Sequence, residues 1–281
     1  MWACWTSPRL FPATYYLTAG NCTASIFIYT LTTTISWKLL NQIVALTTGS
    51  PVHADRHGDL QHALDVGTGS GVWMSEMSRQ HPHCQFVGCD VVDQTSAEAL
   101  PPQCSFIYGD ILQCLPFDDD QFDLVHQSFM LFHIPRKQWR HVLEELARVC
   151  KRGGIVNVVE LDWRPIRAGP SCTRIANAIE HCQDALAMDC RVTARLARLL
   201  GHAGFTDVSE QCVDIPLGCW GGKLGACMQQ AFSQVVNSAA PMLRRLGALA
   251  QHELDHHMQA MDAELGRHRT SIALHVYTAR K

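Results

Sequence analysis

The chain has 281 residues, of which 47% are hydrophobic and 17% charged, and its formal net charge is -3. This composition suffices for one large globular domain with additions. Phosphate binding needs clustered Lys and Arg, and the chain carries no basic tract, so the sequence argues against nucleic acid as a main partner.

The 13 cysteines are odd in number, scattered, and never spaced Cys-x-x-Cys. This excludes zinc-ribbon and thioredoxin-like motifs and predicts a reducing, cytoplasmic location. Residues 24–46 are apolar but are interrupted by Ser36, Lys38 and Asn41, whereas a membrane-spanning helix needs about 20 mostly apolar residues. We therefore expect no stable membrane insertion and no signal peptide, and interpret residues 1–59 as an N-terminal segment, a candidate lid.

From residue 63 onward, apolar runs alternate with helical patterns, which is typical of a parallel sheet covered on both faces. We predict strands at 63–66, 85–89, 105–108, 122–127, 155–161, 207–215 and 271–278, and helices at 72–80, 135–150, 170–200 and 224–265. The predicted fold class is α/β, a doubly wound, mostly parallel seven-stranded sheet. Residues 60–281 form its domain, and a helical insertion at 219–266 precedes the last strand as a second candidate for a cap.

The first predicted strand runs into a glycine-rich turn, LDVGTGSG at residues 64–71. Glycines let the backbone turn sharply and approach a ligand closely. The spacing Gly-x-Gly-x-Gly differs from the Gly-x-Gly-x-x-Gly of dinucleotide folds. The alternative is a tight turn that binds no ligand. The residues that accompany the turn therefore decide between a ligand-binding turn and a purely structural one.

Polar residues follow the next strands. Asp90 ends the second strand about 20 residues after the turn, where an acid accepts hydrogen bonds from ribose hydroxyls. Asp110 ends the third strand and can accept from an adenine amino group beside the Ile111 backbone. Gln127 and Ser128 end the fourth. All lie at the carboxyl ends of parallel strands, where open α/β sheets bind ligands.

The stretches ALDVGTGSGVW, FVGCD, YGDILQCLPFDDDQFDLVHQSFMLFHI and ELARVCKRGGIVNVVELDW, in this order, resemble class I S-adenosylmethionine (SAM)-dependent methyltransferases with a Rossmann-like fold. The similarity is to the broad group that includes ubiquinone-type and fungal secondary-metabolism enzymes, and it covers about residues 60–281. It implies SAM as cofactor and a small-molecule acceptor. The implied cofactor-binding residues are Asp65, Gly67, Thr68, Gly69, Gly71, Asp90, Val91, Asp110, Ile111 and Gln127. Of these, the glycines would line the methionine part, Asp90 the ribose, Asp110 and Ile111 the adenine, and Gln127 the sulfonium side.

Two residues are candidate catalytic groups. His133 follows the fourth strand, and its imidazole could take a proton from the acceptor; the equal alternative is a histidine that packs near the cofactor. Glu160 ends the fifth strand, where a solvated carboxylate is the slightly favoured alternative to catalysis.

Two motifs suggest metals, but we predict no metal site. His252-Glu253-Leu254-Asp255-His256 fits the zincin pattern His-Glu-x-x-His, yet no third ligand is evident. The acidic run at 118–120 lacks the spacing of a calcium loop and is more simply a polar turn.

The sequence favours transfer of a methyl group from SAM to a small molecule, a secondary metabolite, by in-line displacement. The alternatives are a regulatory protein with a SAM fold, or an enzyme that catalyses a cyclisation or isomerisation. The cofactor residues favour an enzyme over a regulator but do not separate the two kinds of enzyme, because fold alone does not fix function.

Overall fold

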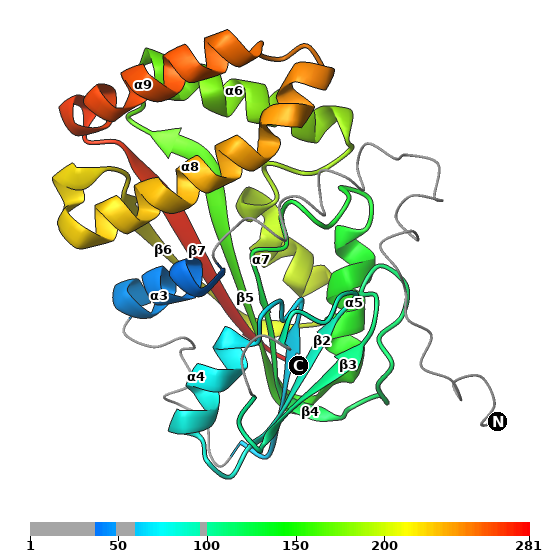
Figure 1. Ribbon diagram of the computed structural model, residues 1–281. Coiled ribbons are helices and arrows are strands. Elements are labelled where there is room, and N and C mark those ends of the chain that lie inside the picture. The colour runs from blue at the N-terminus through cyan, green and yellow to red at the C-terminus, as the bar shows by residue number, and fades with distance from the viewer. Residues whose placement is uncertain (1–36, 49–59, 96–99) are drawn as a thin grey trace.

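The computed structural model describes residues 37–48, 60–95 and 100–281 (Figure 1). In chain order its elements are α3 (Trp37–Thr48), β1 (His62–Val66), α4 (Val72–Gln80), β2 (Gln85–Asp90), β3 (Cys104–Tyr108), β4 (Phe122–Ser128), α5 (Trp139–Val149), β5 (Cys150–Ile166), α6 (Pro170–Ala185), α7 (Thr193–His202), β6 (Thr206–Pro216), the short 3-10 helix η2 (Cys219–Gly221), α8 (Gly222–Arg245), α9 (Gln251–His268) and β7 (Ser271–Arg280). Most of the expected lid at residues 1–59 lies outside the described residues, and α3 is the part of it that can be placed.

The seven strands form one sheet in the order β3-β2-β1-β4-β5-β7-β6. Strands β1 to β5 run parallel, and β7 lies between β5 and β6, antiparallel to both. The predicted doubly wound, mostly parallel α/β fold is confirmed. The chain leaves β1 toward β2 and β3 on one side and returns to β4 on the other, which creates a crevice at the carboxyl ends of β1 and β4.

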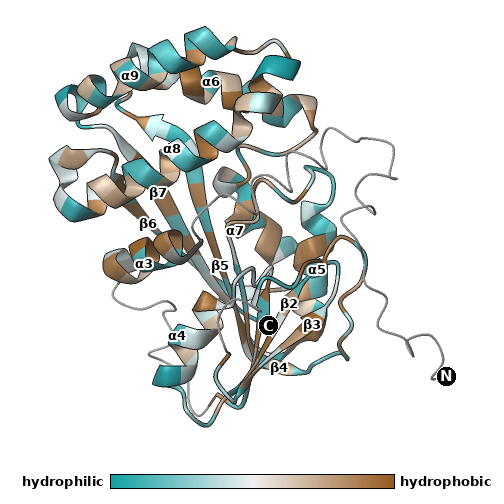
Figure 2. Cartoon of the chain, in the orientation of Figure 1, coloured by the Kyte–Doolittle hydropathy of each residue, from teal (hydrophilic) through white to brown (hydrophobic). Residues whose placement is uncertain are grey.

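Helices cover both faces of the sheet. On one face, α4 buries Trp73, Met74 and Met77 against Phe86 and Leu124. Helices α5 and α7 lie on the opposite face (Figure 1). Apolar colour is concentrated on the strands and on α3, whereas α9 is largely hydrophilic (Figure 2). The sheet core is therefore continuous with the apolar surface of α3.

Helices α6, α8 and α9 make a further layer beyond one end of β5 and β7 (Figure 1). Helix α6 packs against α8 and α9, and α8 also contacts α3. The helical insertion expected at 219–266 corresponds to η2, α8 and α9. None of the helices in the described ranges combines the length and apolar character needed to cross a bilayer.

Four predicted elements have wrong boundaries. The predicted helix 224–265 is two helices, α8 and α9, interrupted between Arg245 and Gln251. Helix α5 begins at Trp139, because Pro135 instead pairs with Met188 in an isolated bridge. Strand β5 begins at Cys150, well before residue 155: Gly153 adopts φ 78°, and a register shift against β4 absorbs the residues expected to end the helix. The predicted helix 170–200 is two helices, interrupted between Ala185 and Thr193.

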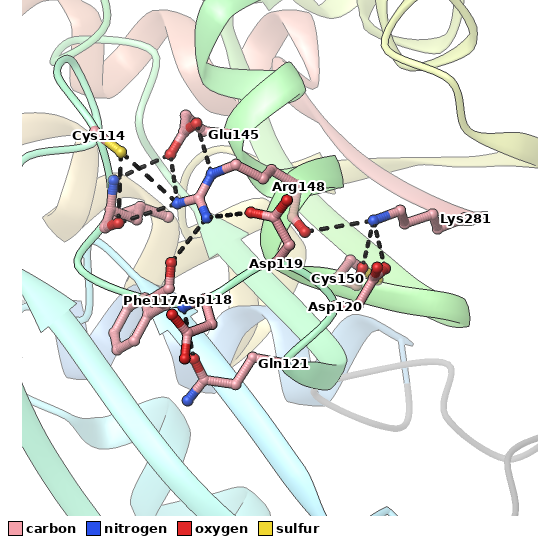
Figure 3. A network of polar contacts seen from close by, with 11 residues as sticks. Cys114, Phe117, Asp118, Asp119, Asp120, Gln121, Glu145, Arg148, Cys150 and Lys281 are labelled. Carbon is pink, nitrogen blue, oxygen red and sulfur yellow. Dashed lines mark hydrogen bonds and ion pairs between the residues drawn. The ribbon is translucent and has the colours of Figure 1, made fainter. Parts of the chain in front are cut away.

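Arg148, near the end of α5, holds the connection between β3 and β4 in place (Figure 3). Its guanidinium donates to the carboxylates of Glu145 and Asp119 at 3.0 and 2.9 Å. It also donates to the backbone carbonyls of Phe117 and Leu115 at 2.8 and 3.0 Å. A charged donor, held by Glu145 of its own helix, thus satisfies three oxygen acceptors of a segment that has no regular structure.

The acidic run at 118–120 is part of the same network. Asp119 pairs with Arg148, and Asp120 accepts a hydrogen bond from the Lys281 ammonium at 2.8 Å. The Asp118 backbone N–H donates to Gln121 at 3.1 Å. These contacts are those of a polar turn held by two cations.

We expect Arg148→Met to lower the free energy of unfolding by about 2–3 kcal/mol, because it leaves partly buried acceptors unpaired. Arg140→Met is the matched control: Arg140 pairs with Glu144 on the exposed side of the same helix, so its loss should lower stability much less than the loss of Arg148. Urea unfolding followed by circular dichroism measures both. Equal losses in the two variants would contradict the role given to Arg148.

Candidate functional site

A pocket opens at the carboxyl ends of the parallel strands, with an empty volume of about 1150 Å³ including its open mouth. Its lining comes from the ends of β1, β2 and β4, the segments that follow β1, β2, β3 and β4, and the helices α3 and α4. The residues are Asn41, 65–69, Trp73, 89–92, Gln94, 109–112, Leu115, 128–130 and His133. The crevice expected from the strand order therefore contains a real cavity.

The glycine turn forms one wall of the pocket. Gly67 and Gly69 have φ of 72° and 51°, a region that disfavours other residues. The backbone N–H groups of Gly67 and Thr68 donate to the Cys89 carbonyl at 2.8 and 3.3 Å, which ties the turn to β2. A Cβ on Gly67 would lie 2.6 Å from the Met130 sulfur. A side chain there would strain the turn and press on the opposite wall.

Asp90 braces the turn from the end of β2. Its carboxylate accepts the backbone N–H of Gly69 at 2.9 Å and that of Val92 at 3.3 Å. Burial raises the pKa of Asp90, partly offset by these hydrogen bonds. A carboxylate has about four lone-pair positions, so both oxygens can still accept from a ligand.

Two more carboxyl groups line the cavity. Asp65, at the end of β1, is almost fully buried and accepts the Thr68 hydroxyl at 2.7 Å. Burial raises the pKa of Asp65 to about 7. Asp110, after β3, accepts from the Leu112 backbone N–H at 2.9 Å and from the Gln113 amide at 3.0 Å. Three acidic side chains, Asp65, Asp90 and Asp110, thus line the β1–β3 side of the pocket.

The segment after β4 forms the facing wall. Phe129 adopts φ 57°, an unfavourable conformation for a bulky residue, and strain of this kind concentrates at functional sites. Three successive backbone N–H groups are captured by β5. Phe129 donates to the Val159 carbonyl at 2.9 Å, and Met130 and Leu131 donate to the Glu160 carboxylate at 2.7 and 3.3 Å. These hydrogen bonds offset the strain and fix the Met130 side chain against the glycine turn.

Glu160 is therefore no solvated strand end, and that expectation is wrong. Strand β5 continues to Ile166, so Glu160 lies inside it and is fully buried. Burial raises the pKa of its carboxyl to about 8. It lies behind the pocket wall and outside the lining, where it positions the backbone of the segment after β4.

His133 lines the pocket from the end of the same segment. Its backbone N–H donates to the Met130 carbonyl at 2.8 Å, which closes a turn. Burial lowers the pKa of its imidazole to about 4, against a weaker opposing effect of a hydrogen bond with the Phe129 backbone. The ring is neutral at physiological pH and retains the capacity to accept a proton, although as a weaker base than an ordinary histidine.

The structure brings most of the predicted residues together in one pocket lining: Asp65, Gly67, Thr68, Gly69, Asp90, Val91, Asp110, Ile111 and His133. Gly71 and Gln127 are outside it. Gly71, with φ 74°, caps the start of α4. Gln127 is fully buried, and its neighbour Ser128 lines the cavity instead, because successive strand residues face opposite sides of a sheet.

Several lining residues were missed by the sequence analysis. Trp73 stacks in parallel on His126 with ring centroids 4.2 Å apart, and His126, a buried core residue, bonds to Asn157 at 2.9 Å. Met130 comes from the irregular segment after β4. Asn41 comes from α3, which is distant in sequence from the other lining residues. Of these missed residues, only Trp73 carried a sequence signal, its position in a predicted helix directly after the glycine turn.

The zincin-like motif lies on α9, far along the chain from the pocket lining. Glu253 accepts the Ala250 backbone N–H at 2.7 Å and so caps the start of this helix. Within the described ranges, no three His, Cys, Asp or Glu residues are grouped in a way that could hold a metal ion.

Comparison with known proteins agrees with this geometry. Residues 63–154, which include the glycine turn, Asp90 and Asp110, match the family model of a methyltransferase domain. Over residues 63–154 the chain is therefore similar to a methyltransferase domain.

Two fungal proteins resemble the methyltransferase domain and its flanks. Over 103 residues the chain is 31% identical to "Secondary metabolism regulator laeA" of Coprinopsis cinerea, a match that covers 37% of this chain and 25% of that protein. It is 26% identical to "Methyltransferase str3" of Strobilurus tenacellus, over 64% of this chain and 68% of that protein. The chain thus matches only about a quarter of the length of the first relative.

A solved structure shares the fold. The phosphoethanolamine N-methyltransferase 2 of Haemonchus contortus, in complex with S-adenosyl-L-methionine, superposes with a TM-score of 0.54 at 14% identity. The match covers 98% of this chain and 61% of that chain. The methyltransferase domain therefore has the sheet architecture of such enzymes.

We expect Glu160 to make stability pH-dependent. Its pKa is about 8 in the fold against an ordinary value of 4.5, so the folded state binds more protons between these values. The free energy of unfolding should then fall as pH rises from about 4.5 to about 8. Glu160→Gln stays neutral and should remove this part of the slope, measured by urea unfolding at several pH values. Glu144→Gln, at an exposed position of α5, is the control. A constant difference between wild type and Glu160→Gln across this range would contradict the assignment.

Proposed function

We propose that this chain is a SAM-dependent methyltransferase that transfers a methyl group to a small-molecule acceptor, a secondary metabolite, by in-line displacement. The observation that carries the proposal is the convergence of the glycine turn, Asp90 and Asp110 in one cavity of a methyltransferase domain. The fungal relatives named for secondary metabolism and for methyl transfer support the acceptor class.

The residues of the cavity fit SAM. The backbone of Gly67 and Gly69 would lie against the methionine part, where a Cβ on Gly67 would meet Met130. Asp90 would accept from the ribose hydroxyls with lone pairs that Gly69 and Val92 leave free. Asp110 and Ile111 would hold the adenine, and Ser128, in place of Gln127, would face the sulfonium side. The cation carried by SAM suits the acidic β1–β3 side.

When bound, SAM supplies an electrophilic methyl group, so the chain must align a nucleophile and exclude water. His133 lines the cavity on the β4 side, and we assign it to accept a hydrogen bond from a protonated acceptor atom and then its proton. Glu160 contributes indirectly, by fixing the Phe129–Leu131 backbone on which that wall depends.

We assign the cap over the acceptor side to α3 and the helical insertion. Asn41 of α3 lines the cavity, and α3 packs against α8. Phe132, Trp163 and Phe232 form a chain of ring contacts, with centroids 5.5 and 6.0 Å apart, from the segment after β4 across β5 to α8. Movement of α8 would thus be transmitted through these ring contacts to the wall of the cavity that holds His133.

A regulatory role is the second candidate, because the Coprinopsis cinerea relative bears the name of a regulator. Incubation with labelled SAM and metabolite extracts separates the two. We expect a labelled small molecule together with S-adenosylhomocysteine, both detected by mass spectrometry. Label recovered on protein alone, or SAM bound without turnover in extracts of many kinds, would favour regulation.

Asp90→Ala should weaken SAM binding by about 1.5–3 kcal/mol, because it removes a charged acceptor from the ribose and a brace from Gly69. Gly69→Val should weaken it further, since a branched residue is strained at φ 51°. Asp93→Ala is the control: Asp93 bonds locally to Thr95 and lies outside the lining. Titration calorimetry gives the affinities. Wild-type affinity in both folded site variants would place the cofactor elsewhere.

His133→Ala should cut turnover at saturating substrates by about 10²–10⁴-fold if the acceptor atom arrives protonated. SAM affinity should stay within a fewfold of wild type, because the cofactor rests on the other side of the cavity. Single-turnover rates with the identified acceptor measure the effect. Rates within a fewfold of wild type in both His133→Ala and His133→Gln would remove His133 as the base.

A further inference from the structure

The last two strands bring a cysteine, a histidine and a glutamate together, outside the pocket lining. Cys212 of β6 lies directly opposite His275 of β7, and Glu210 lies opposite Tyr277. Directly opposed residues of an antiparallel pair share one face. The Cys212 sulfur is 4.0 Å from Nε2 of His275, and Nδ1 of His275 is 2.7 Å from the Glu210 carboxylate.

The arrangement fixes the protons of the imidazole. A carboxylate only accepts hydrogen bonds, so Nδ1 of His275 carries a hydrogen and Nε2 presents its lone pair to the thiol. The Tyr277 hydroxyl, which has one hydrogen to donate, lies 2.6 Å from the Thr193 carbonyl and 3.1 Å from the Glu210 carboxylate. Its ring lies parallel to the imidazole within 6°. Nucleophile, base and orienting carboxylate thus follow in order.

The nucleophile and the base differ in exposure in the way such chemistry requires. Cys212 is exposed to solvent, whereas the His275 side chain is only 14% exposed. Reagents therefore reach the sulfur, while the base is sheltered from water.

The charges around Cys212 determine which class of electrophile can react with its thiol. Burial, followed by the carboxylates of Asp214, Glu210 and Asp162, raises the pKa of the Cys212 thiol. The thiol is therefore protonated near neutral pH, and its attack depends on a base that removes the proton. The same carboxylates repel anionic reagents, which favours a neutral electrophile.

We propose that Cys212 is a nucleophile assisted by His275 and a covalent modification site for neutral α,β-unsaturated carbonyl compounds. The sulfur forms a bond to the β-carbon as the carbon–carbon double bond opens. The thiol proton passes to Nε2 of His275 and then to the α-carbon, so the addition needs no oxidant, reductant or leaving group. The site lies on β6 and β7, separated by β5 from the strands that carry the cavity, and is independent of the proposed methyl transfer.

Acrylamide, a neutral α,β-unsaturated amide, tests this on the full chain at pH 7, with adducts quantified for each cysteine by peptide mass spectrometry. Cys219 is the internal reference: it is exposed too, and its thiol donates to the Gln229 amide oxygen at 4.0 Å instead of facing an imidazole there. Cys212 should react at least about tenfold faster than Cys219. His275→Gln should bring the two rates together and leave Cys219 unchanged, and His268→Gln, at an exposed histidine on α9, should change neither.

A wild-type Cys212 rate no higher than that of Cys219 overturns the proposal without any variant. An unchanged Cys212 rate in folded His275→Gln also overturns it. If His275→Gln does not fold, Glu210→Gln keeps the imidazole in place and should still slow Cys212 severalfold relative to Cys219. An unchanged ratio of the two rates in Glu210→Gln contradicts the role of the carboxylate.

Discussion

The hydrogen bond from the Gly69 backbone to the Asp90 carboxylate joins the ends of two neighbouring strands, and the pocket depends on this connection. Glycines at positive φ make the turn after β1 possible, but the same freedom would leave it loosely defined. Asp90 and the Cys89 carbonyl together restrict the turn to one position over β2. Asp90, which we place against the ribose, thus also shapes the binding surface. Ligand binding and local stability are therefore coupled at this residue.

The facing wall is built on the same principle, a buried carboxyl group that accepts backbone N–H groups. A buried carboxyl from β5, Glu160, gathers two backbone N–H groups of a strained segment that no regular structure supports. Burying carboxyl groups is costly, as the raised pKa values of Asp65 and Glu160 show. This unfavourable burial of a carboxyl group occurs on both sides of the cavity, at Asp65 and at Glu160. This is the pattern expected when the geometry of a site is selected over maximal stability.

The part of the site that lies at regular strand ends was predictable from sequence. The glycine turn, Asp90 and Asp110 each follow a recognisable apolar strand, and parallel strands bring their carboxyl ends to one edge. The segment after β4 was less predictable. Side chains alternate between the faces of a strand, so whether Gln127 or Ser128 faces the cavity depends on register, which the sequence leaves open. A left-handed Phe129 has no sequence signal, and the burial of Glu160 follows from the continuation of β5 to Ile166. Asn41 reaches the cavity only through the packing of α3 against α4 and α8.

The central claim is that this cavity holds SAM between the glycine turn and the segment after β4. A crystal structure of the chain with S-adenosylhomocysteine tests it most directly. The account predicts ribose hydroxyls on the Asp90 carboxylate, the adenine beside Asp110 and Ile111, and the thioether sulfur between Gly67 and Ser128. Electron density for the ligand outside this cavity, or inside it with the adenine and methionine ends exchanged, would contradict the account.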